Sequence, residues 1–133
     1  PRAVLGGVPD GIPLARLDMD QATALIEHGT PVTDPVTQNY IRLTERVTGN
    51  DLRALLAIAG GMRESHTVDP DPAHAPQQPV LFATGSLDGI IEGSRALAAA
   101  TPQGRFLEIP DRHHFNAPGS RVFRQAAIEF LGE

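Results

Sequence analysis

Three short strand-like runs, each followed by a stretch with helical periodicity, limit most strongly what this chain can fold into. The runs are residues 3–8, 80–84 and 105–109, and the last two are followed by expected helices over 91–100 and about 118–131. The first run is apolar without alternation, which is typical of a parallel strand covered on both faces. Because strands that alternate with helices imply right-handed crossovers, the sequence predicts an α/β fold with a three-stranded parallel sheet.

Between the first and second runs, cap residues and glycines predict three short helices. Residues 64–79 then hold four prolines and no periodicity, which is typical of a linker. We therefore expect residues 12–75 to be a helical insertion with its linker, and residues 1–11 and 76–133 to form the sheet domain. The expected helix boundaries are Asp18 or Asp20 to Gly29, Asp34-Pro35 to Gly49, and Asn50 to Gly60-Gly61.

A sheet of only three strands leaves residues 3–8 at an edge, with unpaired backbone groups and apolar side chains. The edge is expected to pair with the N-terminal half of the same protein or with the partner of a homodimer. The chain also opens at Pro1 with no initiator Met and no signal-peptide pattern. A cloned fragment, a proteolytic product and a mature chain without its leader all fit this opening, and we favour a fragment.

Overall composition argues against several classes of partner. A length of 133 residues suits one domain, and the formal charge of −5 argues against nucleic acid and anionic membranes, which call for a basic patch. The chain has no Cys, which excludes disulfides, thiol catalysis and Cys-ligated metal and is compatible with a cytoplasmic protein. The apolar stretches are too short to span a bilayer.

Polar residues that could carry chemistry gather in the loops after the second and third strands, residues 84–89 and 110–116. Loops at the carboxyl ends of parallel strands lie at the same edge of a sheet, and adjacent strands are ~5 Å apart. We therefore expect Asp88 and His114 to lie within hydrogen-bond reach. Gly6-Gly7 lacks the phosphate-loop pattern, and we expect it to let a backbone approach this region closely.

The segment 79–88, Pro-Val-Leu-Phe-Ala-Thr-Gly-Ser-Leu-Asp, resembles the α/β-hydrolase strand and loop that carry the acid of a catalytic triad. Residues 105–110, followed by His114-Phe115 and a helix ending at Leu131, resemble the family's last strand, catalytic histidine and closing helix. Similar chains place the triad in the order Ser, Asp, His. The resemblance is strongest over residues 79–131.

This resemblance implies the C-terminal half of an α/β-hydrolase fold, with residues 3–8 as the sixth strand and 12–75 as a helical cap. It implies that Asp88 orients the imidazole and that His114 acts as general base and then acid on an ester or related acyl bond of a small molecule. Dehalogenases and epoxide hydrolases of similar fold use an Asp nucleophile, so the nucleophile and the substrate stay open.

The family's nucleophile elbow, G-x-S-x-G, is absent from the sequence. Ser86 follows a glycine but lies in the acid's own loop, and the other serines lie in the linker, on a helix or at a helix start: Ser65, Ser94 and Ser120. The oxyanion donors would also lie upstream. Without a nucleophile and an oxyanion hole, this polypeptide alone is expected to be inactive.

Less specific interpretations of the same residues stay open. Asp88 before a glycine also fits a turn or a helix cap, His114 also fits a structural histidine, and His113 is the alternative functional histidine. A metal site of Asp111 with these histidines is disfavoured because adjacent loop histidines rarely reach one centre, so neither metal nor cofactor is expected. A function of another class also fits, namely a non-catalytic α/β interaction module that pairs through the edge of strand 3–8.

Overall fold

The computed structural model describes residues 1–8, 11–12, 14–64 and 69–133. The chain divides into two units, one made of Pro1–Gly11 and Thr67–Glu133 and the other of Ile12–His66. Residues 69–75, which the sequence pattern grouped with the helical insertion, thus belong to the first unit. Across the described ranges, no helix has the length and apolar character needed to cross a membrane.

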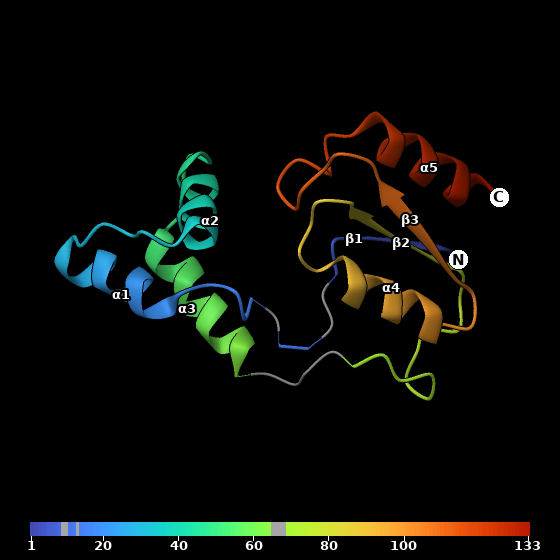
Figure 1. Ribbon diagram of the computed structural model, residues 1–133, viewed down its shortest axis with the longest axis horizontal. Helices are drawn as coiled ribbons and strands as arrows, with labels where there is room; N and C mark the ends of the chain where they lie inside the picture. The colour runs from blue at the N-terminus through green and yellow to red at the C-terminus, as the bar shows by residue number, and fades with distance from the viewer. Residues whose placement is uncertain (9–10, 13, 65–68) are drawn as a thin grey trace. The chain divides into compact units, whose positions relative to one another are not determined.

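The first unit is built on a parallel sheet whose three strands lie in the order β1-β2-β3 (Figure 1). The strands are β1 (Ala3–Gly6), β2 (Val80–Gly85) and β3 (Gly104–Ile109). The predicted α/β fold with a three-stranded parallel sheet is confirmed. β1 is shorter than expected because Gly7 has a φ of +61°, outside the extended region. In the turn expected to follow, Pro9-Asp10 lies outside the described residues.

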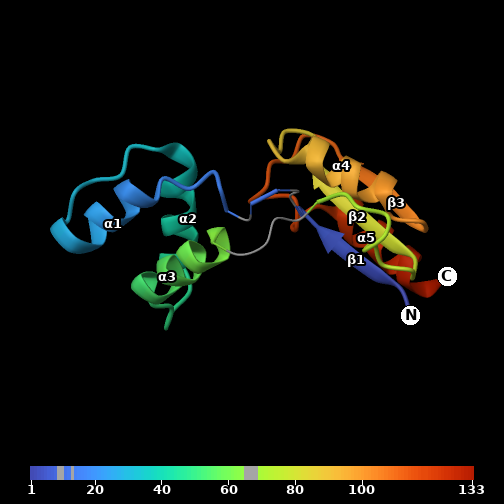
Figure 2. The same ribbon diagram turned by 90° about the horizontal axis from the view of Figure 1, so that it is seen from below.

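One helix covers each face of the sheet, as Figure 2 shows from a second direction. Helix α4 (Ile91–Ala100) packs on the face that carries Phe82. On the opposite face, Phe123 of α5 (Arg121–Gly132) packs against a cluster that includes Ile109. Every residue of β2 is buried, as a strand covered on both faces requires. The two layers leave the carboxyl edge of the sheet for the loops.

The second unit consists of three helices, α1 (Met19–His28), α2 (Pro35–Glu45) and α3 (Leu52–Arg63). Each begins behind an aspartate whose carboxylate accepts the backbone N–H three residues further on, which satisfies one orphan donor of the first turn. These caps are Asp18, Asp34 and Asp51. The expected Asp34-Pro35 start and the expected end of α1 at Gly29, which is left-handed, are confirmed.

The boundary between α2 and α3 differs from the sequence expectation. Asn50 does not cap α3, because its side-chain amide donates to the carbonyl of Thr44 at 3.0 Å, near the end of α2. Asp51 caps α3 instead, accepting the Ala54 N–H at 3.2 Å. Helix α2 correspondingly ends four residues before Gly49.

The glycine pair of α3 does not end the helix, contrary to the sequence expectation. Gly60-Gly61 lies inside α3, which continues to Arg63. The guanidinium of Arg63 donates to the carbonyl of Leu17 at 2.6 Å, and Met19 lies close to Gly60. Packing against the start of α1 therefore offsets the low helix propensity of two glycines.

Candidate active site

Two loops meet at the carboxyl edge of the sheet, where β2 and β3 end side by side. Gly85, the last residue of β2, is in register with Ile109, the last residue of β3. A Cβ placed on Gly85 would lie 2.1 Å from the carbonyl oxygen of Arg112 in the loop after β3. Only glycine permits this approach, so residue 85 brings the two loops into direct contact.

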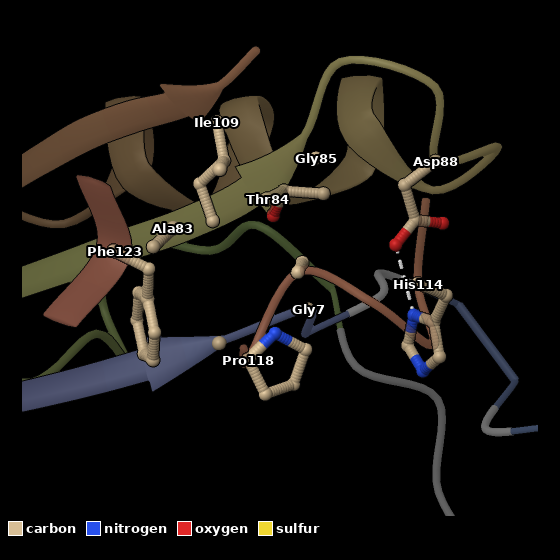
Figure 3. A pocket seen from close by; sticks show the side chains of 11 residues that line it. Gly7, Ala83, Thr84, Gly85, Asp88, Ile109, His114, Pro118 and Phe123 are labelled. Atoms are coloured by element: carbon tan, nitrogen blue, oxygen red, sulfur yellow. Dashed lines mark hydrogen bonds and ion pairs between the residues drawn. The ribbon is translucent and has the colours of Figure 1, made fainter. Parts of the chain in front are cut away.

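The carboxylate of Asp88 is buried in the loop after β2, with its side chain 4% exposed. The Asp88 N–H donates to the carbonyl of Gly85 at 3.0 Å, and Asp88 Oδ1 accepts the Ile90 N–H at 3.2 Å. The other oxygen, Oδ2, lies 2.8 Å from Nδ1 of His114 (Figure 3). The prediction that the two side chains lie within hydrogen-bond reach is confirmed. The same carboxylate also stabilises the turn after β2 by accepting the Ile90 N–H.

The imidazole of His114 is half exposed, at 49% of its side chain. Because Nδ1 faces a carboxylate, the neutral ring carries its proton on Nδ1 and keeps the lone pair on Nε2. The ring meets Phe115 edge-on, with centroids 5.5 Å apart. It also lies against Gly7, where a Cβ would be 3.1 Å from His114 Cε1. The close approach expected at Gly6-Gly7 is therefore present, and it is made to an imidazole.

The neighbouring histidine has a different environment. His113 Nδ1 accepts the Phe115 N–H at 3.2 Å, and the His113 N–H donates to Asn116 Oδ1 at 2.8 Å. Of the two adjacent histidines, the one bonded to the buried carboxylate is His114. In the described part of the chain, no three His, Asp or Glu side chains lie close enough together to hold a metal ion.

Several solved structures of known proteins are similar to this chain. No protein-family model and no curated protein matches the sequence. Among solved structures, 99% of the chain matches 56% of an enol-lactonase from Burkholderia xenovorans LB400, with a TM-score of 0.69 and 20% identity. A thermophilic esterase from Thermogutta terrifontis is matched over 98% of this chain and 55% of its own, with a TM-score of 0.62 and 25% identity. A hydrolase from Pseudomonas aeruginosa PA01 is matched over 99% and 56%, with a TM-score of 0.66 and 19% identity. The chain has the α/β-hydrolase fold.

The α/β-hydrolase fold is present here in part, because the chain spans about half the length of the structures it matches. The half in question is the C-terminal one, in agreement with the resemblance of residues 79–131. Likeness at this level of identity concerns the fold, and the activities named above belong to those proteins.

Next to the acid and histidine, the α/β-hydrolase core has a hollow of about 90 Å³ (Figure 3). Glycine backbone and apolar side chains form most of its lining, including Gly6, Ala83, Pro118 and Phe123. Thr84 also lines it, and the Thr84 hydroxyl is buried without a hydrogen-bond partner among the described residues. The surroundings of His114 are therefore mostly apolar, with one unused hydroxyl.

Among the described residues, the hydroxyls of two serines form hydrogen bonds, and neither bond is to the imidazole of His114. The hydroxyl of Ser86 accepts the Asp111 N–H at 2.9 Å, and that of Ser94 donates to the carbonyl of Val8. Ser65 lies outside the described residues. Sequence reasoning set Ser86 aside as a nucleophile but did not find its bond to the histidine loop. Its place beside a glycine in a turn was the available signal.

Proposed function

We propose that this chain supplies the acid and the histidine of a catalytic triad that hydrolyses an ester or related acyl bond of a small molecule. The contact of 2.8 Å between Asp88 Oδ2 and His114 Nδ1 carries the proposal. Asp88 fixes the tautomer and stabilises the imidazolium, while Nε2 of His114 accepts the proton of the nucleophile and returns it to the leaving group. The position supports this role, because ligands of open α/β sheets bind beyond the carboxyl ends of the strands.

In this proposal the nucleophile comes from a segment outside the chain. The sequence contains no G-x-S-x-G, and the hydroxyls of Ser86 and Ser94 are bonded elsewhere. The nucleophile and the oxyanion donors supply the largest catalytic effects, so residues 1–133 alone hydrolyse no substrate at an enzymatic rate.

The free edge of β1 supports a strand partner that brings this segment. The N–H groups of Ala3 and Gly7 donate towards β2, so those of the alternate residues Val4 and Gly6 point to the free edge. β1 itself carries no charge, whereas the opposite edge strand carries Glu108, a charged residue of the kind that blunts sheet edges. We take the partner to be the preceding half of the fold, pairing in parallel with β1.

The test is hydrolysis of p-nitrophenyl acetate by the complete protein and its variants. Asp88→Asn keeps the shape of the side chain but favours the wrong tautomer, and we expect it to lower kcat on the order of 10³-fold or more. His114→Ala should lose at least as much. His113→Ala is the matched control in the same loop, and it should retain most of the activity. Full activity in Asp88→Asn and His114→Ala would refute the proposal, and a complete wild-type protein that does not hydrolyse the ester would favour the non-catalytic interaction module.

A further inference from the structure

Besides the contact between Asp88 and His114, three hydrogen bonds hold the acid loop to the end of β3 and to the loop that carries His114. Two of them are main-chain bonds, from the Ser86 N–H to the Ile109 carbonyl and from the Leu87 N–H to the Arg112 carbonyl, each at 2.9 Å. The third uses a side chain, since the Asp111 N–H donates to Ser86 Oγ at 2.9 Å. The side-chain bond is therefore the one that a substitution can remove while the main-chain bonds remain.

This side-chain bond falls on a strained residue. Asp111 has a φ of +54°, in the left-handed region that a non-glycine residue adopts only at a cost. Such a conformation persists when the surroundings fix it, and the Ser86 hydroxyl accepts the N–H of this residue. Asp111 lies three residues before His114, so its backbone angles set the direction in which the chain enters the histidine turn.

We propose that Ser86 is a positioning residue, whose hydroxyl fixes the left-handed turn at Asp111 and thereby holds His114 Nδ1 against Asp88. This role rests on the proposed function of the pair and gives the serine of the acid loop a purpose other than nucleophilic attack. Ser86 acts through the loop and touches neither the substrate nor the proton in transfer. Without the Ser86 hydroxyl, the two main-chain bonds still keep the loops together, so the fold stays intact. The turn at Asp111 is then no longer fixed, and the imidazole is misaligned.

The experiment compares Ser86→Ala, which removes the acceptor, with Ser86→Thr, which keeps it. Because one hydrogen bond is at stake, we expect Ser86→Ala in the complete protein to lower kcat about fivefold with KM unchanged, and Ser86→Thr to retain the activity. The His114 Nδ1–H resonance in the proton NMR spectrum should broaden through faster exchange with water in Ser86→Ala and stay sharp in Ser86→Thr.

A double-mutant cycle with Asp88→Asn separates positioning from a general effect on folding. If Ser86 acts by aligning His114 with the carboxylate, Ser86→Ala should cause no further loss once the carboxylate is gone. An equal fivefold loss in both backgrounds, or a Ser86→Ala protein with wild-type kcat and an unchanged His114 resonance, would overturn the inference.

Failure of the proposed function gives a different pattern. In that case Asp88→Asn and His114→Ala retain full hydrolysis, whatever happens at Ser86. The NMR comparison of Ser86→Ala with Ser86→Thr still decides whether the hydroxyl holds the imidazole, because it needs no substrate.

Discussion

The contact between Gly7 and His114 allows a prediction whose size follows from the structure. Gly7→Ala introduces two separate penalties. One is the left-handed backbone at a φ of +61°, which a side chain disfavours. The other is a steric conflict, because the new Cβ would lie 3.1 Å from Cε1 and 3.3 Å from Nδ1 of His114. Relief of that conflict requires the imidazole to shift by a few tenths of an ångström.

The backbone penalty is about 1–2 kcal/mol for an alanine in this region. The steric conflict adds about 1 kcal/mol or more, the lower end for overpacking. A misplacement of 1 Å can cost ~10²-fold in rate, so a shift of a few tenths of an ångström should lower kcat about four- to tenfold. The backbone penalty therefore lowers only the stability, whereas the steric conflict lowers both the stability and kcat.

Gly11→Ala is the control that isolates the backbone penalty. Gly11 has a φ of +73° in the same unit, and among the described residues no atom beyond its chain neighbours lies within 4 Å of an added Cβ. In the complete protein, we expect urea denaturation to show Gly7→Ala as less stable than Gly11→Ala by about 1 kcal/mol. Only Gly7→Ala should lower kcat. Equal stabilities together with equal kcat values would refute the reasoning that residue 7 must be small because of His114.

Two further predictions concern other parts of the chain. Hydrogen bonds from the Thr37 hydroxyl and N–H lower the pKa of Asp34, so the carboxylate stabilises α2 above the ordinary aspartate pKa, and this is lost as pH falls through the lowered value. The stability gap between wild type and Asp34→Ala, followed by helical circular dichroism in urea, should be constant near neutrality and shrink in acid; a gap that persists in acid would contradict this. At the sheet edge, Val4→Pro removes an N–H that points away from β2, so it should destabilise the complete protein by about 1 kcal/mol more than the 133-residue chain alone. Equal losses in the two would argue against a strand partner on β1.

Much of the fold was predictable because each element carries local signals. Helical periodicity and the Asp34-Pro35 start indicate where the chain turns helical, and the apolar runs indicate buried strands. The pairing of Asp88 with His114 was predictable for a topological reason, since residues that follow adjacent parallel strands share one edge of the sheet.

The misses arise where a distant residue decides a local outcome. Asn50 carries a good capping side chain, but the carbonyl of Thr44 binds it, and nothing in the local pattern distinguishes it from Asp51. The pair Gly60-Gly61 locally predicts the end of a helix, but the helix continues because Arg63 bonds the residue just before the cap of α1. The bond from Asp111 to Ser86 joins residues 25 apart in sequence, so it becomes visible only once both loops are placed.

In the function proposed above, the acid and histidine of this chain activate a nucleophilic serine that lies outside it. The most direct measurement treats the complete protein with a fluorophosphonate, which modifies activated serines covalently, and maps the adduct by mass spectrometry. We predict one adduct on a serine outside residues 1–133, and its loss in His114→Ala. An adduct on any of the four serines of residues 1–133, an adduct that survives in His114→Ala, or no adduct at all would contradict this proposal.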